Sequence, residues 1–228
     1  MMPVASVSVL AMLATFMAGD VGKGPQPSPT PVAWEFELAF EDPKRIDVFV
    51  PGEGTTTYWY MLYTVSNPGR QGQRFFPLFQ IVTEDLQVVD TDMGINLRVF
   101  DEIAARHNKV YKYLVPPTQA IGALLAGDDN ARESVAIWRG VDLSQTAFSI
   151  FVAGLSGETR VVENPAYKPG EPETRSFIGP DGRPTAVTLN PKTFTLRKTL
   201  EVQYTLPGSK HARTVTAPQR GQVRWVMR

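Results

Sequence analysis

The sequence predicts a mainly β protein, an antiparallel β-sandwich of immunoglobulin-like type with one inserted α-helix at about residues 97–114. Roughly eight to ten short segments alternate in polarity or are enriched in aromatic and β-branched residues, as strands are. Clusters of turn-forming residues separate these segments, and a helical period occurs in one place only. The Cys–Trp–Cys pattern of antibody domains is absent, and a β-barrel is the alternative.

Two strands are predicted at the start of the domain, at residues 34–40 and 45–50. In the first, large apolar side chains alternate with Glu35, Glu37 and Ala39, which is typical of a strand with one buried face. The second continues this alternation, with isoleucine and valine directed inward.

Residues 55–83 hold two long apolar runs and predict a central β-hairpin. The turn formers of residues 67–72 separate the runs. Residues 58–65 carry bulky side chains on both faces, so this strand is expected to be covered on both sides. Pro77 would remove a ladder hydrogen bond from the second strand, which predicts an edge or a bulge at that position.

Residues 97–114 repeat apolar side chains at helical spacing and predict the only long helix. Asn96 is the expected N-cap, and Pro116 and Pro117 the stop. Strand patterns then return, at residues 118–125, 134–138, 147–154, 194–206 and 223–227. Between them, residues 163–192 contain six prolines and a Pro-Asp-Gly turn, which predicts a long mobile excursion with a small hairpin.

The N-terminal region differs in composition from the rest. Residues 1–19 are apolar and uncharged, which predicts a signal peptide or an N-terminal membrane anchor, and residues 20–33 form a Pro-rich linker. Residues 34–228 are then a single domain. We expect an exported protein, periplasmic or extracellular, with the cytoplasm as the disfavoured alternative. Membrane contact is expected only through an uncleaved N-terminus.

Composition excludes several kinds of chemistry. The 228 residues include no cysteine, which rules out disulfides, thiolate catalysis and cysteine-ligated zinc. A formal net charge of zero gives no reason to expect nucleic acid as a partner. The charges are unevenly placed, because seven lysine and arginine residues follow residue 192 and Glu201 is the only acidic residue there.

Four segments resemble an uncharacterised class of exported bacterial Ig-like proteins: YWYMLYTVSN (58–67), RFFPLFQIVT (74–83), GDDNARESVAIW (127–138) and TAFSIFVAGLSG (146–157). The pattern is an aromatic strand ending in Tyr-Thr-Val-x-Asn, a Phe-rich partner strand and a strand ending in Gly-Leu-Ser. The resemblance covers residues 34–157 and the C-terminal strand pair. It implies a sandwich and export, and it carries over no catalytic residue.

Two acidic loops contain the candidate metal ligands. The first imperfectly matches positions one, three, seven and twelve of a calcium loop, with Asp90, Asp92, Asn96 and Asp101. The second is a turn with Asp128 and Asp129. Acidic residues are common in solvated turns and near helix N-termini, so no metal and no cofactor is the favoured interpretation and calcium is the alternative.

Three other groups of residues are candidate sites. His107 and His211 lie far apart in the sequence, and a packed His107 is favoured over a catalytic one. The hairpin contains enough aromatic residues to form a carbohydrate-binding platform, but burial in the core is the favoured interpretation. These residues are Tyr58, Trp59, Tyr60, Tyr63, Phe75, Phe76 and Phe79. Arg220, Arg224 and Arg228 would share one face of a regular last strand; they guard a sheet edge or, as a weaker candidate, contact a partner.

These observations favour a non-enzymatic, exported binding or structural module of the cell envelope, whose partner is an unknown envelope protein or polymer. Two alternatives stay open. One is a metal-dependent or carbohydrate-active protein that uses the loop carboxylates. The other is an accessory subunit of a larger envelope assembly, in which residues 163–192 become ordered on a partner.

Overall fold

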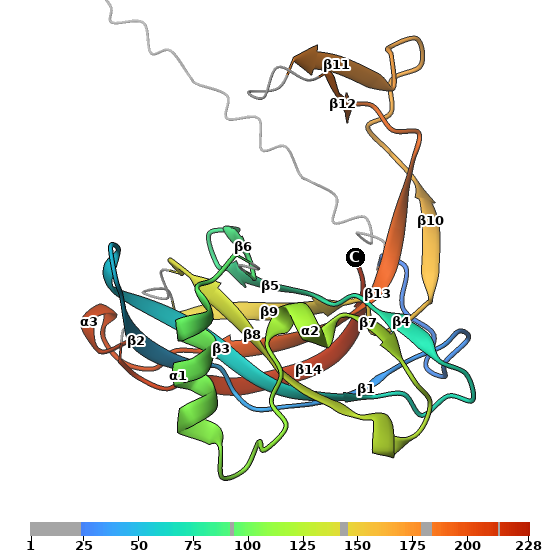
Figure 1. Ribbon diagram of the computed structural model, residues 1–228. Coiled ribbons are helices and arrows are strands. Elements are labelled where there is room, and N and C mark those ends of the chain that lie inside the picture. The colour runs from blue at the N-terminus through green and yellow to red at the C-terminus, as the bar shows by residue number, and fades with distance from the viewer. Residues whose placement is uncertain (1–23, 92–93, 142–145, 179–183, 214) are drawn as a thin grey trace, which may run out of the picture.

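The computed structural model describes residues 24–91, 94–141, 146–178, 184–213 and 215–228 (Figure 1). The protein is mainly β, with 47% of its residues in strands and three helices in these ranges. Every strand pair is antiparallel, and the described sheets do not close into a barrel, so the barrel alternative is wrong for this part of the chain. The predicted signal peptide, Asp92 and the Pro-Asp-Gly turn lie outside the described residues.

The first sheet is built around its longest strand, β3. Its members are β1 (Glu37–Phe40), β2 (Lys44–Val50), β3 (Gly54–Ser66) and β8 (Arg132–Arg139). β1 and β2 pair with successive parts of β3, and β8 pairs with β3 over residues 58–65. The predicted inward face of residues 45–50 is confirmed, because Ile46, Val48 and Val50 are buried.

The second sheet is built around β13. Its members are β5 (Leu78–Thr83), β6 (Val88–Asp90), β9 (Ala147–Ala153), β10 (Thr159–Glu163), β13 (Thr193–Thr205) and β14 (Gln219–Met227). β13 pairs with β10 over residues 193–197 and with β9 over residues 200–205. β14 pairs with β13 over residues 198–205, and β5 joins β9 to β6.

The remaining elements are short. Two small ribbons pair β4 (Gln73–Phe75) with β7 (Gly122–Leu124) and β11 (Thr174–Ile178) with β12 (Pro184–Thr188). The helices are α1 (Leu97–His107), α2 (Pro117–Ala120), α3 (Lys210–Arg213) and the 3-10 turn Asp128–Asn130. No helix within the described ranges is long and apolar enough to cross a membrane.

The two large sheets face each other across a shared core, and this arrangement corrects the predicted central hairpin. β3 and β5 lie in different sheets, and the rings of Tyr63 and Phe79 meet between them at a centroid distance of 4.8 Å. β3 could not pair with β5, because β1, β2 and β8 already occupy its edges. The turn residues between the runs instead carry the chain across the core, held by hydrogen bonds from the Asn67 side chain to the carbonyls of Gln71 and Leu124.

Both faces of β3 are buried, as the sequence predicts. Trp59, Met61 and Tyr63 face the second sheet in the core between the layers. Tyr58, Tyr60 and Leu62 form a second core with α1, β2 and β8. Aromatic side chains bury large areas, so these two cores supply much of the hydrophobic stabilisation.

α1 is shorter than the predicted helix. Asn96 is the N-cap, its side chain accepting a hydrogen bond from the Arg98 N–H, but the helix ends at His107. Tyr111 and Leu114 still pack partly against the core beneath α1, although they lie beyond the end of the helix. The predicted strand at residues 118–125 is also largely wrong, because Pro117 suits the first turn of a helix and begins α2.

Residues 159–178 and 184–197 form a projecting arm. β10 and the first part of β13 run as a two-stranded ribbon beyond the first sheet, and β11 and β12 form a hairpin at its far end (Figure 1). The predicted small hairpin within residues 163–192 is therefore confirmed. Pro77 also interrupts a strand as predicted, since β4 ends before it and β5 begins after it.

Gly154 and Gly157 permit close contacts where β9 passes into β10. Gly154 has a φ of +83°, and a Cβ atom there would lie 2.3 Å from the Phe76 carbonyl oxygen. A Cβ atom on Gly157 would lie 2.5 Å from Trp34 Nε1. The Gly-Leu-Ser-Gly segment is thus explained by backbone geometry and packing.

We expect Gly154→Ala to lower the free energy of unfolding by about 1–3 kcal/mol, because the substitution combines a strained φ with a clash against backbone. Gly72→Ala is the matched control, since its Cβ would meet its nearest neighbour at an ordinary 3.5 Å. Urea unfolding of the two variants and the parent measures the difference. Equal stability of the two variants would contradict the close approach of β9 to residue 76.

Candidate functional site

The outward side of the second sheet, here called the open face, is the strongest candidate for a binding surface. Helices α1 and α2 pack elsewhere, α1 on β2 and α2 on β8 of the first sheet. Residues of β5, β9 and β13, together with Arg228 after β14, instead line two open grooves of about 330 Å³ and 420 Å³. Because neighbouring strands of one sheet present these residues, the grooves stand on a rigid base.

A pair of arginines lines the smaller groove. Arg197 donates its N–H to the Arg228 carbonyl oxygen at 2.7 Å, and Arg228 returns the bond at 3.0 Å. Residues paired in this way project their side chains on the same face of a sheet. No Asp or Glu side chain in the described ranges forms an ion pair with either guanidinium, although Arg228 lies 4.2 Å from the centroid of the Phe151 ring. The groove therefore presents two guanidinium groups.

On the same face, Glu201 forms an ion pair with Arg224 and accepts further hydrogen bonds. Its carboxylate accepts from Arg224 Nε at 2.7 Å, from Gln203 at 3.1 Å and from the Ser149 hydroxyl at 3.3 Å. Burial disfavours the ionised form, but the hydrogen bonds from Arg224 and Gln203 outweigh it and hold the pKa of Glu201 below its usual range. The carboxylate thus stays ionised and fixes Arg224 against the sheet.

Comparison with known proteins adds no functional assignment. No protein-family model, curated protein or solved structure matches this chain significantly. The assignment of a site therefore depends on the geometry of the chain itself.

The three C-terminal arginines do not form one row. β14 contains a bulge opposite the stretch between Val202 and Tyr204, and the extra residue turns Arg220 to the opposite face from Arg224. Arg220 bonds Asp42 at 2.6 Å and stacks over Phe40 of the first sheet. The prediction of a shared face is wrong, because it assumed a regular strand.

The acidic candidates occupy separate places. Asp90 accepts a hydrogen bond from Gln80 at 2.7 Å, Asn96 caps α1, and Asp101 is exposed on that helix. Asp128 and Asp129 lie in the 3-10 turn, at a different end of the molecule from β6 (Figure 1). The described residues contain no group of three His, Asp or Glu side chains arranged to hold a metal ion. Within these residues, no calcium site is assembled.

His107 joins α1 to the first sheet. Its Nε2 lies 3.0 Å from the Tyr60 hydroxyl, and its ring also packs edge-on against Tyr111. Burial lowers the pKa of His107, and the nearby positive charge of Lys44 lowers it further. His211 lies exposed in α3, so the two histidines are parts of different surfaces.

The aromatic residues are core residues, with one exception. Tyr58, Trp59, Tyr60, Tyr63, Phe75 and Phe79 are buried, whereas Phe76 is exposed beside the smaller groove. Burial raises the pKa of Tyr63 to about 12, so this hydroxyl is neutral at physiological pH.

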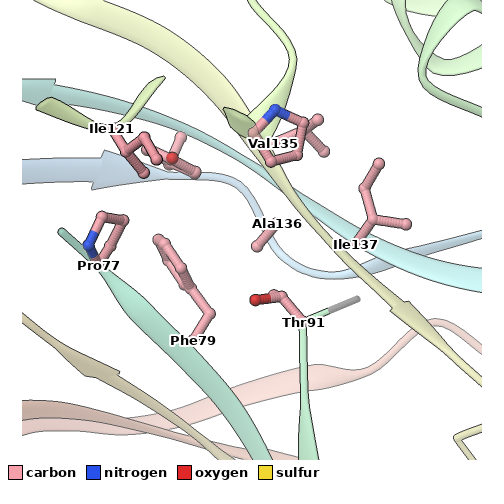
Figure 2. A pocket seen from close by; sticks show the side chains of 9 residues that line it. Pro77, Phe79, Thr91, Ile121, Val135, Ala136 and Ile137 are labelled. Atoms are coloured by element: carbon pink, nitrogen blue, oxygen red, sulfur yellow. The ribbon is translucent and has the colours of Figure 1, made fainter. Parts of the chain in front are cut away.

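One cavity between the sheets is too small for a ligand. Phe79 of β5 faces Ala136 of β8 across it, with Pro77, Thr91 and Ile121 around the sides (Figure 2). It leaves about 20 Å³ for the centre of a water molecule. That is room for about one water, so the interior of the two-layered body is a packed core.

A buried ionic cluster around Lys198 attaches the N-terminal segment. Lys198 is 2% exposed, and its ammonium lies 2.7 Å from Glu35 and 3.7 Å from Glu158. Glu158 also accepts the Ser28 N–H at 2.9 Å, while Lys198 donates to the Ser28 carbonyl at 3.4 Å. Part of the predicted linker therefore rests against the domain. The sequence gives one sign of this cluster, because Lys198 is the single charge on the apolar face of its strand.

We expect Glu158→Gln to reduce stability most at neutral pH. The hydrogen bond from the Ser28 N–H is the main cause that lowers the pKa of Glu158 from its ordinary 4.5. A carboxylate whose pKa is lower in the folded state than in the unfolded state stabilises the fold at pH values above its unfolded-state pKa. This stabilisation is lost as the pH falls through the folded-state pKa. The difference in unfolding free energy between parent and variant should therefore shrink below about pH 4.5.

Urea unfolding at several pH values from 7 to 3 measures this difference. Glu163→Gln is the matched control, because Glu163 is exposed on β10 and forms no ion pair with a described residue. A difference between parent and Glu158→Gln that stays constant over this range would contradict the role of the carboxylate in the cluster.

Proposed function

We propose that this protein is an exported, non-enzymatic binding or structural module of the cell envelope, and that its two packed sheets form an immunoglobulin-like β-sandwich. The projecting arm of residues 159–178 and 184–197 is the observation that carries the proposal. The apolar character of residues 1–19 supports export, and it is independent of the arm.

The arm exposes apolar side chains that its own fold does not bury. Val161 is 66% exposed and Phe194 is 44% exposed, on opposite faces of the ribbon. Leu189, which follows β12, is exposed as well. A two-stranded ribbon has little stability of its own, and exposed apolar groups gathered on one projection are typical of interaction sites. A partner that covers the arm would bury these side chains and stabilise the ribbon.

The open face supports the same function. The first sheet is covered by α1, so its outward residues belong to a core. The second sheet presents grooves and the guanidinium groups of Arg197 and Arg228, with Arg228 over the Phe151 ring. The covered face of the first sheet therefore contributes to stability, and the outward face of the second sheet can contact a partner.

An accessory subunit of a larger envelope assembly is the second candidate, and the arm favours it directly. An arm that reaches away from the body can contact a neighbouring subunit while the body stays separate. The accessory subunit would have a permanent partner, whereas the binding module would not need one.

Site-specific photo-crosslinking in cell fractions of the native host tests the proposal. We expect a photoreactive residue at Val161 or Phe194 to give discrete adducts of defined mass in the envelope fraction, from protein that no longer begins with Met1. Val110, which is 72% exposed beyond the end of α1, is the matched control position. Intact protein confined to the cytosol would contradict export, and adducts no more frequent at the arm than at residue 110 would contradict binding through the arm.

A further inference from the structure

We propose that a groove between Trp34 and the link of residues 67–72 binds an acidic saccharide, as one carboxylate-bearing ring of an envelope polymer. This inference rests on the proposed binding function and deepens it, because it names the chemical class of a ligand at a site other than the arm. Three observations carry it: an exposed indole on a fixed backbone, a rigid link that presents amide side chains, and an arginine that has no partner among the described residues.

Two segments that are distant in the sequence form the groove. Trp34 and Glu35 supply part of its lining, and residues of the link together with Gln73 of β4 supply the rest. The groove has a volume of about 280 Å³, just below the range of about 300–1,000 Å³ that is typical of small-molecule sites. This size suits a single sugar ring, and because the groove is open to solvent, the rest of a polymer can extend beyond it.

Trp34 supplies an aromatic surface in a fixed position. It is 36% exposed, and its ring centroid lies 5.0 Å from that of Phe36. The Gly157 N–H donates to the Trp34 carbonyl oxygen at 2.9 Å, and the absence of a side chain at Gly157 leaves room for the indole. A large aromatic side chain that stays partly exposed on a rigid backbone can pack against the C–H groups of a sugar ring. The aromatic residues predicted as a platform are mostly buried, so Trp34 takes that place.

The link presents polar side chains from a rigid frame. Asn67 is 2% exposed, and its side chain donates to the carbonyls of Gln71 and Leu124 at 2.9 Å and 3.1 Å. It also accepts the Gly69 N–H at 3.0 Å. On this frame, Gln71 and Gln73 bring amide groups to the groove. An amide both donates and accepts hydrogen bonds, as sugar hydroxyls do, so these side chains suit a saccharide.

The charges of the groove favour an acidic sugar over a neutral one. Glu35 is neutralised by Lys198 at 2.7 Å, whereas no Asp or Glu side chain in the described ranges forms an ion pair with Arg70. The bond to Lys198 uses Oε2 of Glu35, and Oε1 forms no hydrogen bond with a described residue. A guanidinium binds a carboxylate through paired hydrogen bonds, and a carboxylate oxygen accepts from a hydroxyl. Arg70 is thus suited to the acid group of the ligand, and Glu35 to a hydroxyl.

Isothermal titration calorimetry of the full chain with trigalacturonic acid tests the inference. We expect saturable binding that weakens as salt is added, and neutral galactotriose of the same linkage should bind at least about tenfold more weakly. Trp34→Ala should weaken binding of trigalacturonic acid by at least about tenfold because the stacking surface is lost, and Trp34→Phe should weaken it less. Arg70→Gln should also weaken it by at least about tenfold, but should leave galactotriose binding unchanged.

Arg74→Gln is the matched control for Arg70→Gln. Arg74 is exposed and does not line the groove, because it projects from β4 on the opposite face to Gln73. Its substitution removes the same charge and should leave binding unchanged. Unchanged melting temperatures of the two arginine variants show that both fold, so their comparison decides the inference even if Trp34→Ala lowers stability. A hexaglutamate peptide supplies carboxylates without sugar rings and should compete poorly.

The outcomes are distinct from those of the crosslinking experiment. The acidic saccharide would be overturned by absence of trigalacturonic acid binding, by equal affinity of the Arg70→Gln and Arg74→Gln variants, or by equal binding of galactotriose or hexaglutamate. Each of these results would leave the arm as a contact site. A failure of crosslinking at the arm together with intact saccharide binding would instead contradict the arm and keep the groove.

Discussion

β3 has both faces buried and partners along both edges, and this constraint fixes the position of the other layers. Its outward face requires α1 as a cover, and its inward face requires the second sheet. Once α1 covers the first sheet, the second sheet keeps an outward face on which neither α1 nor α2 packs. The division between a covered side and an open side therefore follows from a single strand with two apolar faces.

The Lys198 cluster has a comparable role for the N-terminal segment. One buried lysine faces two carboxylates, Glu35 and Glu158, so the lysine alone does not balance the charge. The Ser28 N–H supplies a further donor to Glu158, and the Trp225 ring lies 4.9 Å from the lysine ammonium. Because buried charges need such partners, the segment before β1 is held at a defined place beside β13. The start of the arm and the entry of the chain into the domain thus lie together.

Local patterns located strands such as β2 and β3, but they did not specify how the strands pair. The alternation at residues 45–50 and the two apolar faces of residues 58–65 report burial directly, and both predictions are confirmed. The hairpin prediction failed because a turn-rich link is compatible either with pairing of neighbouring runs or with a crossing between sheets. The pairing of β3 with β5 is excluded because other strands already occupy both edges of β3. One of these strands, β8, is distant from β3 in the sequence.

The candidate site was harder to predict than the fold. Arg220, Arg224 and Arg228 are evenly spaced in sequence, but a bulge separates their faces, and a bulge leaves no clear mark in this stretch. The juxtaposition of Arg197 with Arg228 depends on the register of two strands, which no local pattern specifies. Lys198 gave a signal that no prediction used, since a lysine on the apolar face of a long strand requires buried partners.

These features define a rigid two-layered body and a projecting arm that depends on it for attachment. Stability should be concentrated where β3 is enclosed and should fall along β13 as it leaves the body, because residues 200–205 have described strands on both sides and residues 193–196 have one. Hydrogen–deuterium exchange of the intact protein, read by mass spectrometry, tests this claim most directly. We expect the slowest exchange at residues 58–65, intermediate exchange at residues 198–204 and fast exchange at residues 174–188. Exchange at residues 58–65 as fast as in the β11–β12 hairpin would contradict it.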